Sequence, residues 1–137
     1  MAELKSVILV EDDEFDAIMT LEALRQIPIA NPLIHLETGA DLLDFLDNND
    51  RKSIAVIILD LNMPKIGGLE ALRIMKERNY SETPVVVLTS SAQSPDIKEA
   101  YALGANSYIT KPVQTQTFQS VVANIGLYWG ILNKIPD

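Results

Sequence analysis

The sequence contains no cysteine and a single histidine, His35. The absence of cysteine excludes disulfide bonds, thiol catalysis and zinc–thiolate sites, and one histidine excludes a metal site built from several histidines of the chain. No Gly/Ser-rich, Pro-rich or like-charge stretch divides the chain, and no internal repeat is present. We therefore expect the 137 residues to form one domain.

Basic residues and long apolar runs are also scarce. Lys and Arg together number 11 against 19 Asp and Glu, which gives a net charge of −8. Because so acidic a chain lacks the cations that neutralise phosphates, nucleic acid and anionic membrane surfaces are excluded as expected partners. The apolar run near the N-terminus, residues 7–10, is too short for a signal peptide or a membrane span. The expected compartment is the cytoplasm.

The chain does contain a regular alternation of short apolar runs and amphipathic stretches. The runs at 54–59 and 84–88 do not alternate with polar residues, which is typical of strands covered on both faces. Strands are predicted at 6–10, 33–36, 54–59, 84–88 and 108–110, and helices at 15–27, 40–48, 69–78, 94–103 and from 115 onward. This order predicts an α/β fold: a flavodoxin-like (βα)₅ doubly wound parallel sheet with strand order 2-1-3-4-5 and an extended C-terminal helix.

Polar residues stand where these strands end. Glu11 and Asp12 follow the first strand, Asp60 the third, Thr89 the fourth and Lys111 the fifth. In parallel sheets the carboxyl ends of the strands gather the reactive groups. Three carboxylates held together repel one another unless a cation neutralises them, and oxygen ligands suit a hard divalent ion, Mg²⁺ or else Mn²⁺. A carboxylate in such a site can act as a nucleophile toward a phosphoryl group, whose charge the metal and Lys111 would offset.

Four segments resemble the receiver domain of response regulators in two-component signalling. They are VEDDEFD (10–16), ILDLNMPKIGGLEAL (58–72), VVVLTSSAQ (85–93) and GANSYITKP (104–112). They occur in the family's order and at its spacings, so that the resemblance covers about residues 5–125, with 126–137 as a helical extension. The resemblance implies a stand-alone switch that is phosphorylated by a sensor histidine kinase. Within the family, the chain is similar to short regulators that serve phytochromes, which implies a phytochrome-type photoreceptor kinase.

Carried over by position, the resemblance implies a role for each residue at the strand ends. It implies that Asp60 is the phospho-acceptor and that Mg²⁺ is held by Glu11, Asp12, Asp60 and the main-chain carbonyl of Asn62. It further implies that Thr89 and Lys111 contact the phosphoryl group and that Thr89 and Tyr108 form the switch. The Lys111–Pro112 peptide bond is expected to be cis. Many receivers have Asp where this chain has Glu11. The glutamate side chain is longer but carries the same charge. Acids favour the start of a helix, so Asp13, Glu14 and Asp16 are interpreted as a solvated helix start.

Two apolar surfaces are predicted on the final helix. The first would dock on the sheet and comprises Phe118, Val121, Val122, Ile125, Trp129 and Leu132. The second comprises Leu127, Tyr128, Ile131 and Ile135. A helix over residues 115–134 would be about 30 Å long, whereas a six-residue strand spans about 20 Å, so its end should project and expose apolar residues. Our hypothesis is a homodimer formed through the fourth helix, the fifth strand, the fifth helix and this tail. Alternatively, the tail folds back, or Gly126 and Gly130 end the helix early.

Two other functions compete with the switch. A metal-dependent phosphohydrolase with an aspartyl nucleophile would need an acid/base carboxylate two residues after Asp60, where this chain has Asn62, and the length leaves no cap domain. A non-phosphorylated interaction module with a vestigial pocket is disfavoured because the charged strand-end residues are all retained. In the preferred interpretation, the protein is not a turnover enzyme and catalyses only its own phosphorylation and dephosphorylation. Its output is a protein contact or a phosphate sink.

Overall fold

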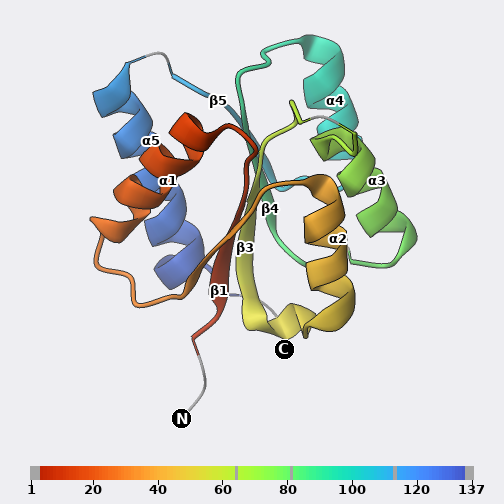
Figure 1. Cartoon of the computed structure of the whole chain (residues 1–137), viewed down its shortest axis with the longest axis horizontal. Coiled ribbons are helices and arrows are strands. Elements are labelled where there is room, and N and C mark those ends of the chain that lie inside the picture. The colour runs from red at the N-terminus through yellow and green to blue at the C-terminus, as the bar shows by residue number, and fades with distance from the viewer. Residues whose placement is uncertain (1–3, 64, 81, 113, 135–137) are drawn as a thin grey trace.

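The five apolar runs form one parallel sheet (Figure 1). The computed structural model describes residues 4–63, 65–80, 82–112 and 114–134. The strands are β1 (Ser6–Val10), β2 (Leu33–Leu36), β3 (Ile54–Leu59), β4 (Val85–Thr89) and β5 (Ser107–Thr110). Their order is β2-β1-β3-β4-β5, and every neighbouring pair is parallel. The predicted doubly wound sheet is therefore confirmed.

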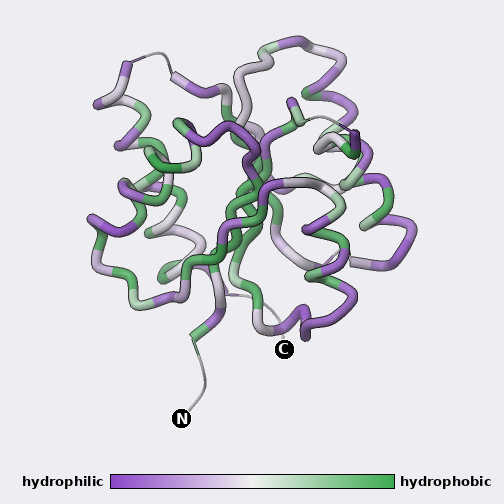
Figure 2. Tube along the Cα trace, viewed as in Figure 1, coloured by the Kyte–Doolittle hydropathy of each residue, from purple (hydrophilic) through white to green (hydrophobic). Residues whose placement is uncertain are grey.

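Helices cover both faces of this sheet. They are α1 (Glu14–Arg25), α2 (Gly39–Asn48), α3 (Gly68–Glu77), α4 (Ser94–Ala102) and α5 (Thr115–Leu127), with short helical turns η1 (Arg51–Ser53) and η2 (Tyr128–Leu132). Helices α1 and α5 lie on one face and α2, α3 and α4 on the other (Figure 1). Successive β1 side chains alternate between the two cores: Ile8 packs toward α2 and α3, and Leu9 toward α1 and α5. Strand β3 is apolar and buried along its whole length, and the middle of the sheet is largely green in Figure 2.

The end of the final helix differs from the expectation. Helix α5 stops at Leu127 and continues as a π-helical turn to Leu132, rather than as a straight helix to residue 134. Gly126 does not break the helix: a Cβ there would lie 2.4 Å from Ile27 Cδ1, so the missing side chain lets α5 approach the segment that follows α1. Gly130 lies against Asn31 less tightly, since a Cβ there would be 3.2 Å from Asn31 Oδ1. The tail therefore packs on the α1–β2 connection instead of projecting freely.

Part of the predicted second apolar surface is exposed. Tyr128 and Ile131 are 49% and 46% exposed, and Leu127 is half-buried. Leu132, which was expected to dock on the sheet, is 67% exposed. Ile135 lies outside the described residues. Within the described part of the chain, no helix is both long enough and apolar enough to cross a membrane.

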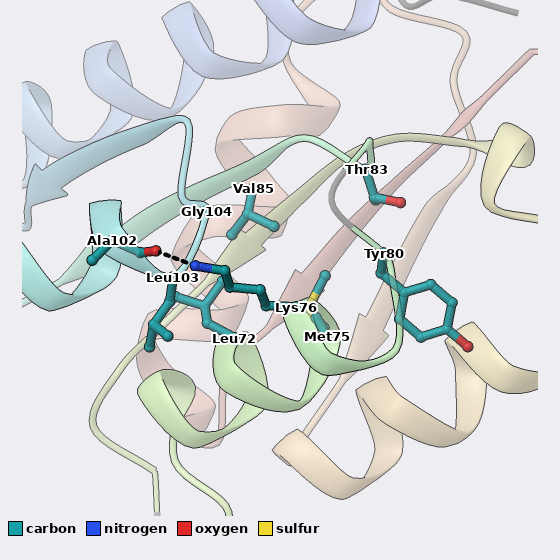
Figure 3. A pocket seen from close by; sticks show the side chains of 9 residues that line it. All are labelled: Leu72, Met75, Lys76, Tyr80, Thr83, Val85, Ala102, Leu103 and Gly104. Atoms are coloured by element: carbon teal, nitrogen blue, oxygen red, sulfur yellow. Dashed lines mark hydrogen bonds between the residues drawn. The ribbon is translucent and has the colours of Figure 1, made fainter.

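A cavity of about 100 Å³ lies near the amino ends of β4 and β5 (Figure 3). Its walls include the apolar side chains of Leu72, Met75 and Val85. Lys76 Nζ donates a hydrogen bond of 3.0 Å to the carbonyl of Ala102, which joins α3 to the end of α4 beside this space. Thr83 also lines it and is buried, yet its hydroxyl has no hydrogen-bond partner among the described residues.

We predict that Thr83→Val stabilises the protein. A buried hydroxyl without a partner has lost its hydrogen bonds to water, and valine has nearly the same shape. The expected gain is about 1 kcal/mol in the free energy of unfolding, or roughly 3 °C in Tm. Thr20→Val is the matched control, because Thr20 is equally buried but its hydroxyl donates to the Asp16 carbonyl at 2.8 Å. Thermal unfolding should show a higher Tm for Thr83→Val and a lower Tm for Thr20→Val. An equal decrease of Tm in both variants would contradict the prediction.

Candidate functional site

Three carboxylates meet at the carboxyl edge of the sheet. Glu11 and Asp12 directly follow β1, and Asp60 directly follows the neighbouring β3. The backbone extends the sheet pairing by one residue here, since Asp60 N–H donates to the Val10 carbonyl at 3.1 Å. One carboxylate oxygen from each of the three acids lies within 4.8 Å of the others. Glu11 and Asp60 are buried, whereas Asp12 is exposed to solvent.

The Lys111 ammonium lies against this group and is itself nearly buried. Its backbone is held beside β4 because Lys111 N–H donates to the Thr89 carbonyl at 2.7 Å. Lys111 Nζ lies 2.6 Å from Glu11 Oε1, 2.8 Å from Asp16 Oδ2 and 3.3 Å from Asp60 Oδ2. An ammonium group has three donors, so the three carboxylates can engage all of them.

This packing shifts the pKa of the groups in different directions. Burial, followed by the hydrogen bond to Asp60, raises the pKa of Glu11 from 4.5 to about 8, although Lys111 opposes the rise. Burial alone would raise the pKa of Asp60, but the hydrogen bond to Glu11 and the Lys111 charge lower it overall. Burial disfavours charge on Lys111, yet its bonds to Asp16 and Glu11 raise its pKa. At neutral pH without metal, therefore, Asp60 is ionised, Lys111 is charged and Glu11 carries a proton.

Asn62 links the acids to the end of β4. Its main-chain N–H donates to Asp60 Oδ1 at 3.1 Å. Its side-chain Nδ2 donates to Thr89 Oγ1 at 3.2 Å and to Ser90 Oγ at 3.1 Å. The close approach of α3 to this loop requires Gly68, where a Cβ would lie 2.5 Å from the Asp60 carbonyl oxygen. The sequence suggested a role only for the Asn62 carbonyl, so the side-chain bridge to Thr89 is an addition.

Tyr108 is tied to the same loop. Its hydroxyl donates to the Ser91 carbonyl at 2.7 Å, two residues beyond Thr89, and its ring is half-buried. The Tyr108 main-chain N–H donates to the Tyr101 hydroxyl on α4 at 3.1 Å. The predicted switch residues are thus connected through the β4–α4 loop, with the Thr89 hydroxyl bonded to Asn62.

The expected cis bond between Lys111 and Pro112 is wrong. No cis peptide bond occurs among the described residues, which include both of these. A trans bond before proline is favoured by about 0.5–1 kcal/mol, so local sequence alone does not require the cis form. Lys111 reaches Glu11 and Asp60 from this trans backbone.

Asp16 was interpreted from the sequence as a solvated residue, and this is also wrong. Asp13 caps α1 by accepting a 2.9 Å hydrogen bond from Asp16 N–H, and that first turn directs the Asp16 carboxylate to Lys111. Helical spacing gives no signal for this contact, because Asp12 precedes the N-cap Asp13 and lies outside α1. For Asp13 and Glu14, both exposed, the interpretation as a solvated helix start agrees with the structure.

Comparison with known proteins agrees with this geometry. The family model described as "Response regulator receiver domain" matches residues 7–123. The chain is 34% identical over 132 residues to "Response regulator Rcp1" of Synechocystis sp., covering 91% of this chain and 88% of Rcp1. It is 31% identical over 134 residues to "Probable methanogenesis regulatory protein FilR2" of Methanothrix harundinacea, covering 95% of this chain and 86% of FilR2.

Solved structures are similar over nearly the whole chain. The Mn²⁺-bound form of Rcp1 has a TM-score of 0.86 at 32% identity and covers 97% of this chain and 99% of its own. Phosphorylated RcpA, described as a cyanobacterial phytochrome response regulator, has a TM-score of 0.88 at 29% identity. The match covers 98% of this chain and 100% of the RcpA chain. With the sheet order and the strand-end acids, these matches establish that the chain belongs to the response regulator receiver domain family.

Proposed function

We propose that this chain is a phosphorylation-driven response regulator in which Asp60 accepts a phosphoryl group from a sensor histidine kinase. The observation that supports this most strongly is the meeting of an ionised, buried Asp60 with a second buried carboxylate and the Lys111 ammonium at the sheet edge. Receiver domains are signalling proteins rather than turnover enzymes. Catalysis by this chain is therefore confined to its own phosphorylation and dephosphorylation.

The donor set fits a hard divalent cation. Glu11, Asp12 and Asp60 supply carboxylate oxygens within 4.8 Å of one another, and the Asn62 carbonyl follows in the same loop. Oxygen-only ligands without sulfur or nitrogen suit Mg²⁺ or Mn²⁺. A bound ion would offset the charge of the acids and of the incoming phosphoryl group. The Mn²⁺ described for the Rcp1 structure supports this assignment.

In the proposed reaction, a carboxylate oxygen of Asp60 attacks the phosphorus of a phosphohistidine. The new P–O bond forms an acyl phosphate while the P–N bond breaks, and its electron pair returns to the imidazole nitrogen. Lys111 donates to a phosphoryl oxygen. The product carries about −1.5 to −2 charges where Asp60 carried one, so it requires a further donor. The Thr89 hydroxyl supplies this donor by giving up its hydrogen bond with Asn62. Tyr108 then moves with the β4–α4 loop, and this movement alters the surface formed by α4, β5 and α5.

Intact mass spectrometry tests this function against its competitors. The protein is incubated with Mg²⁺ and acetyl phosphate, whose P–O bond breaks to release acetate. We expect one added phosphoryl group, which EDTA prevents. Repeated release of phosphate in large excess over protein would indicate a phosphohydrolase, and an unchanged mass would indicate a non-phosphorylated interaction module.

The kinase is proposed to dock over the start of α1. Phe15 and Ile18 are 69% and 53% exposed there, in the helix that also carries Asp16 beside the acids. Large exposed apolar side chains near a reaction centre favour a protein contact. The description of RcpA as a phytochrome response regulator supports a phytochrome-type kinase as the partner. We propose the cytoplasm as the compartment in which the two proteins would meet.

We predict that Phe15→Ser with Ile18→Ser slows phosphotransfer from a phosphorylated histidine kinase at least about tenfold, because each loses apolar contact area worth about 1 kcal/mol or more. Uptake from acetyl phosphate should stay unchanged, since the acids remain intact. Leu4→Ser is the matched control: Leu4 is 56% exposed but precedes β1 at the opposite edge of the sheet. Equal slowing with both phosphoryl donors would contradict docking at this surface.

Homodimerisation through α4-β5-α5 and the tail is likewise proposed. β5 is an edge strand, and a hollow lined by Ile109, Tyr128 and Trp129 lies beside it. Exposed Tyr128 and Ile131 continue this apolar surface. An unpaired strand edge with adjoining apolar side chains suits a second copy of the chain.

We predict that Ile131→Asp converts the dimer to a monomer, because the carboxylate would be buried without a partner in the interface. Light scattering over a concentration series measures the change. Leu4→Asp carries the same added charge at a distant exposed site and should remain dimeric. A dimer unaffected by Ile131→Asp would remove the tail from the interface.

A further inference from the structure

Asp16 is the one partner of Lys111 that has no other task in the proposed site. Glu11 is needed as a cation ligand, and Asp60 is both a ligand and the phospho-acceptor. Asp16 Oδ2 lies 2.8 Å from Lys111 Nζ, and its side chain, in the first turn of α1, is 32% exposed. It is therefore available to Lys111 before and after phosphoryl transfer.

The Lys111 ammonium lies closer to Glu11 and Asp16 than to Asp60. The contacts to Glu11 and Asp16, 2.6 and 2.8 Å, are as short as charge-assisted hydrogen bonds usually are. The contact to Asp60 is longer, at 3.3 Å. Lys111 is thus held slightly away from the acceptor. A tight ion pair on Asp60 would lower the nucleophilicity of its carboxylate, whereas a more distant ammonium still offsets phosphoryl charge.

From these contacts we propose that Asp16 is a positioning residue that keeps Lys111 from pairing tightly with Asp60, so that Lys111 engages the acceptor only through the long 3.3 Å contact. This inference rests on the proposed function. Without the Asp16 charge, Lys111 closes on Asp60, and phosphoryl uptake must first break that pair. Since hydrogen bonds between charged groups are among the stronger ones in proteins, we expect uptake to slow by about tenfold or more.

The backbone around Asp16 allows a clean substitution. Its N–H is bonded to the Asp13 carboxylate at 2.9 Å, and its carbonyl accepts from the Thr20 hydroxyl at 2.8 Å. Neither bond uses the Asp16 side chain, so Asp16→Asn keeps the start of α1. Glu14→Gln is the matched control, because Glu14 is an exposed acid of the same turn and the variant makes the same change of charge.

The test measures the rate of phosphoryl uptake from acetyl phosphate with Mg²⁺ in a double-mutant cycle. We expect Asp16→Asn to slow uptake about tenfold, Asp16→Glu to recover much of the rate, and Glu14→Gln to match the wild type. In a Lys111→Ala background, Asp16→Asn should have no further effect, because Asp16 acts only through Lys111.

The possible failures are distinguishable. Equal slowing by Asp16→Asn with and without Lys111, or a wild-type rate in Asp16→Asn, would overturn the positioning role while leaving the proposed function intact. A wild-type protein that takes up no phosphoryl group would overturn both.

Discussion

Asp60→Asn is expected to abolish phosphoryl uptake and to stabilise the metal-free protein at the same time. Asparagine has no carboxylate to attack phosphorus, so uptake from acetyl phosphate falls below detection. The gain in stability arises because Asp60 and Glu11 are 6% and 2% exposed and lie side by side, and Asp60 is one of the causes that raise the pKa of Glu11. At neutral pH the metal-free fold must keep a proton on Glu11 that the unfolded chain releases, and the neutral residue at position 60 removes part of that cost.

The neutral amide can keep one of the two contacts of the aspartate. Its oxygen can accept from the Asn62 N–H, as Asp60 Oδ1 does at 3.1 Å. Lys111 loses its 3.3 Å contact to Asp60 Oδ2 but keeps the shorter ones to Glu11 and Asp16. The expected gain is about 1–3 kcal/mol in the free energy of unfolding, measured by urea denaturation in EDTA. Asp44→Asn removes an equal charge at an exposed position and should change stability by less than about 0.5 kcal/mol. A destabilised Asp60→Asn, or one that still takes up phosphate, would contradict this prediction.

The affinity for Mg²⁺ is expected to depend steeply on pH. Glu11 has a pKa of about 8 in the metal-free protein, mainly because it is buried. Below that pH it holds a proton that must leave before the carboxylate can bind a cation. The Mg²⁺ affinity should therefore rise about tenfold per pH unit from roughly pH 6 to pH 8 and level off above. Calorimetry in buffers of different ionisation enthalpy would detect the released proton.

The same shift sets the sign of the pH dependence of stability. The unfolded chain releases the Glu11 proton near its ordinary pKa of 4.5, whereas the folded protein keeps it to about 8. The stabilisation is therefore fully present below 4.5 and is lost as the pH rises through about 8 in the absence of metal. Glu11→Gln should remove both trends. A Mg²⁺ affinity that does not change between pH 6 and 8, with no proton released, would contradict a protonated Glu11.

The main features of the site follow from the sequence because a parallel sheet brings the carboxyl ends of its strands to one edge. Glu11, Asp60 and Lys111 could be placed together from strand boundaries alone. Asp16 could not, because its role depends on how the first turn of α1 leans toward Lys111. That is a tertiary relation, which the capping bond from Asp13 makes possible but does not reveal in sequence.

The differences at the C-terminus and at Pro112 have similar causes. Gly126 lowers helix propensity, yet α5 continues past it, because the missing side chain makes room for Leu24 and Ile27. Packing therefore outweighs propensity at this position. The Lys111–Pro112 bond depends on a preference of only about 0.5–1 kcal/mol, which neighbouring residues in sequence do not decide.

The central claim is that the phosphoryl group resides on Asp60, and chemical mapping tests it most directly. The protein is phosphorylated with acetyl phosphate and Mg²⁺, the acyl phosphate is reduced with sodium borohydride, and the peptides are sequenced by mass spectrometry. We expect the reduced residue, homoserine, at position 60 and at no other aspartate. Modification at Asp12 or another acid, or an unmodified position 60 in a protein whose intact mass has increased, would contradict the claim.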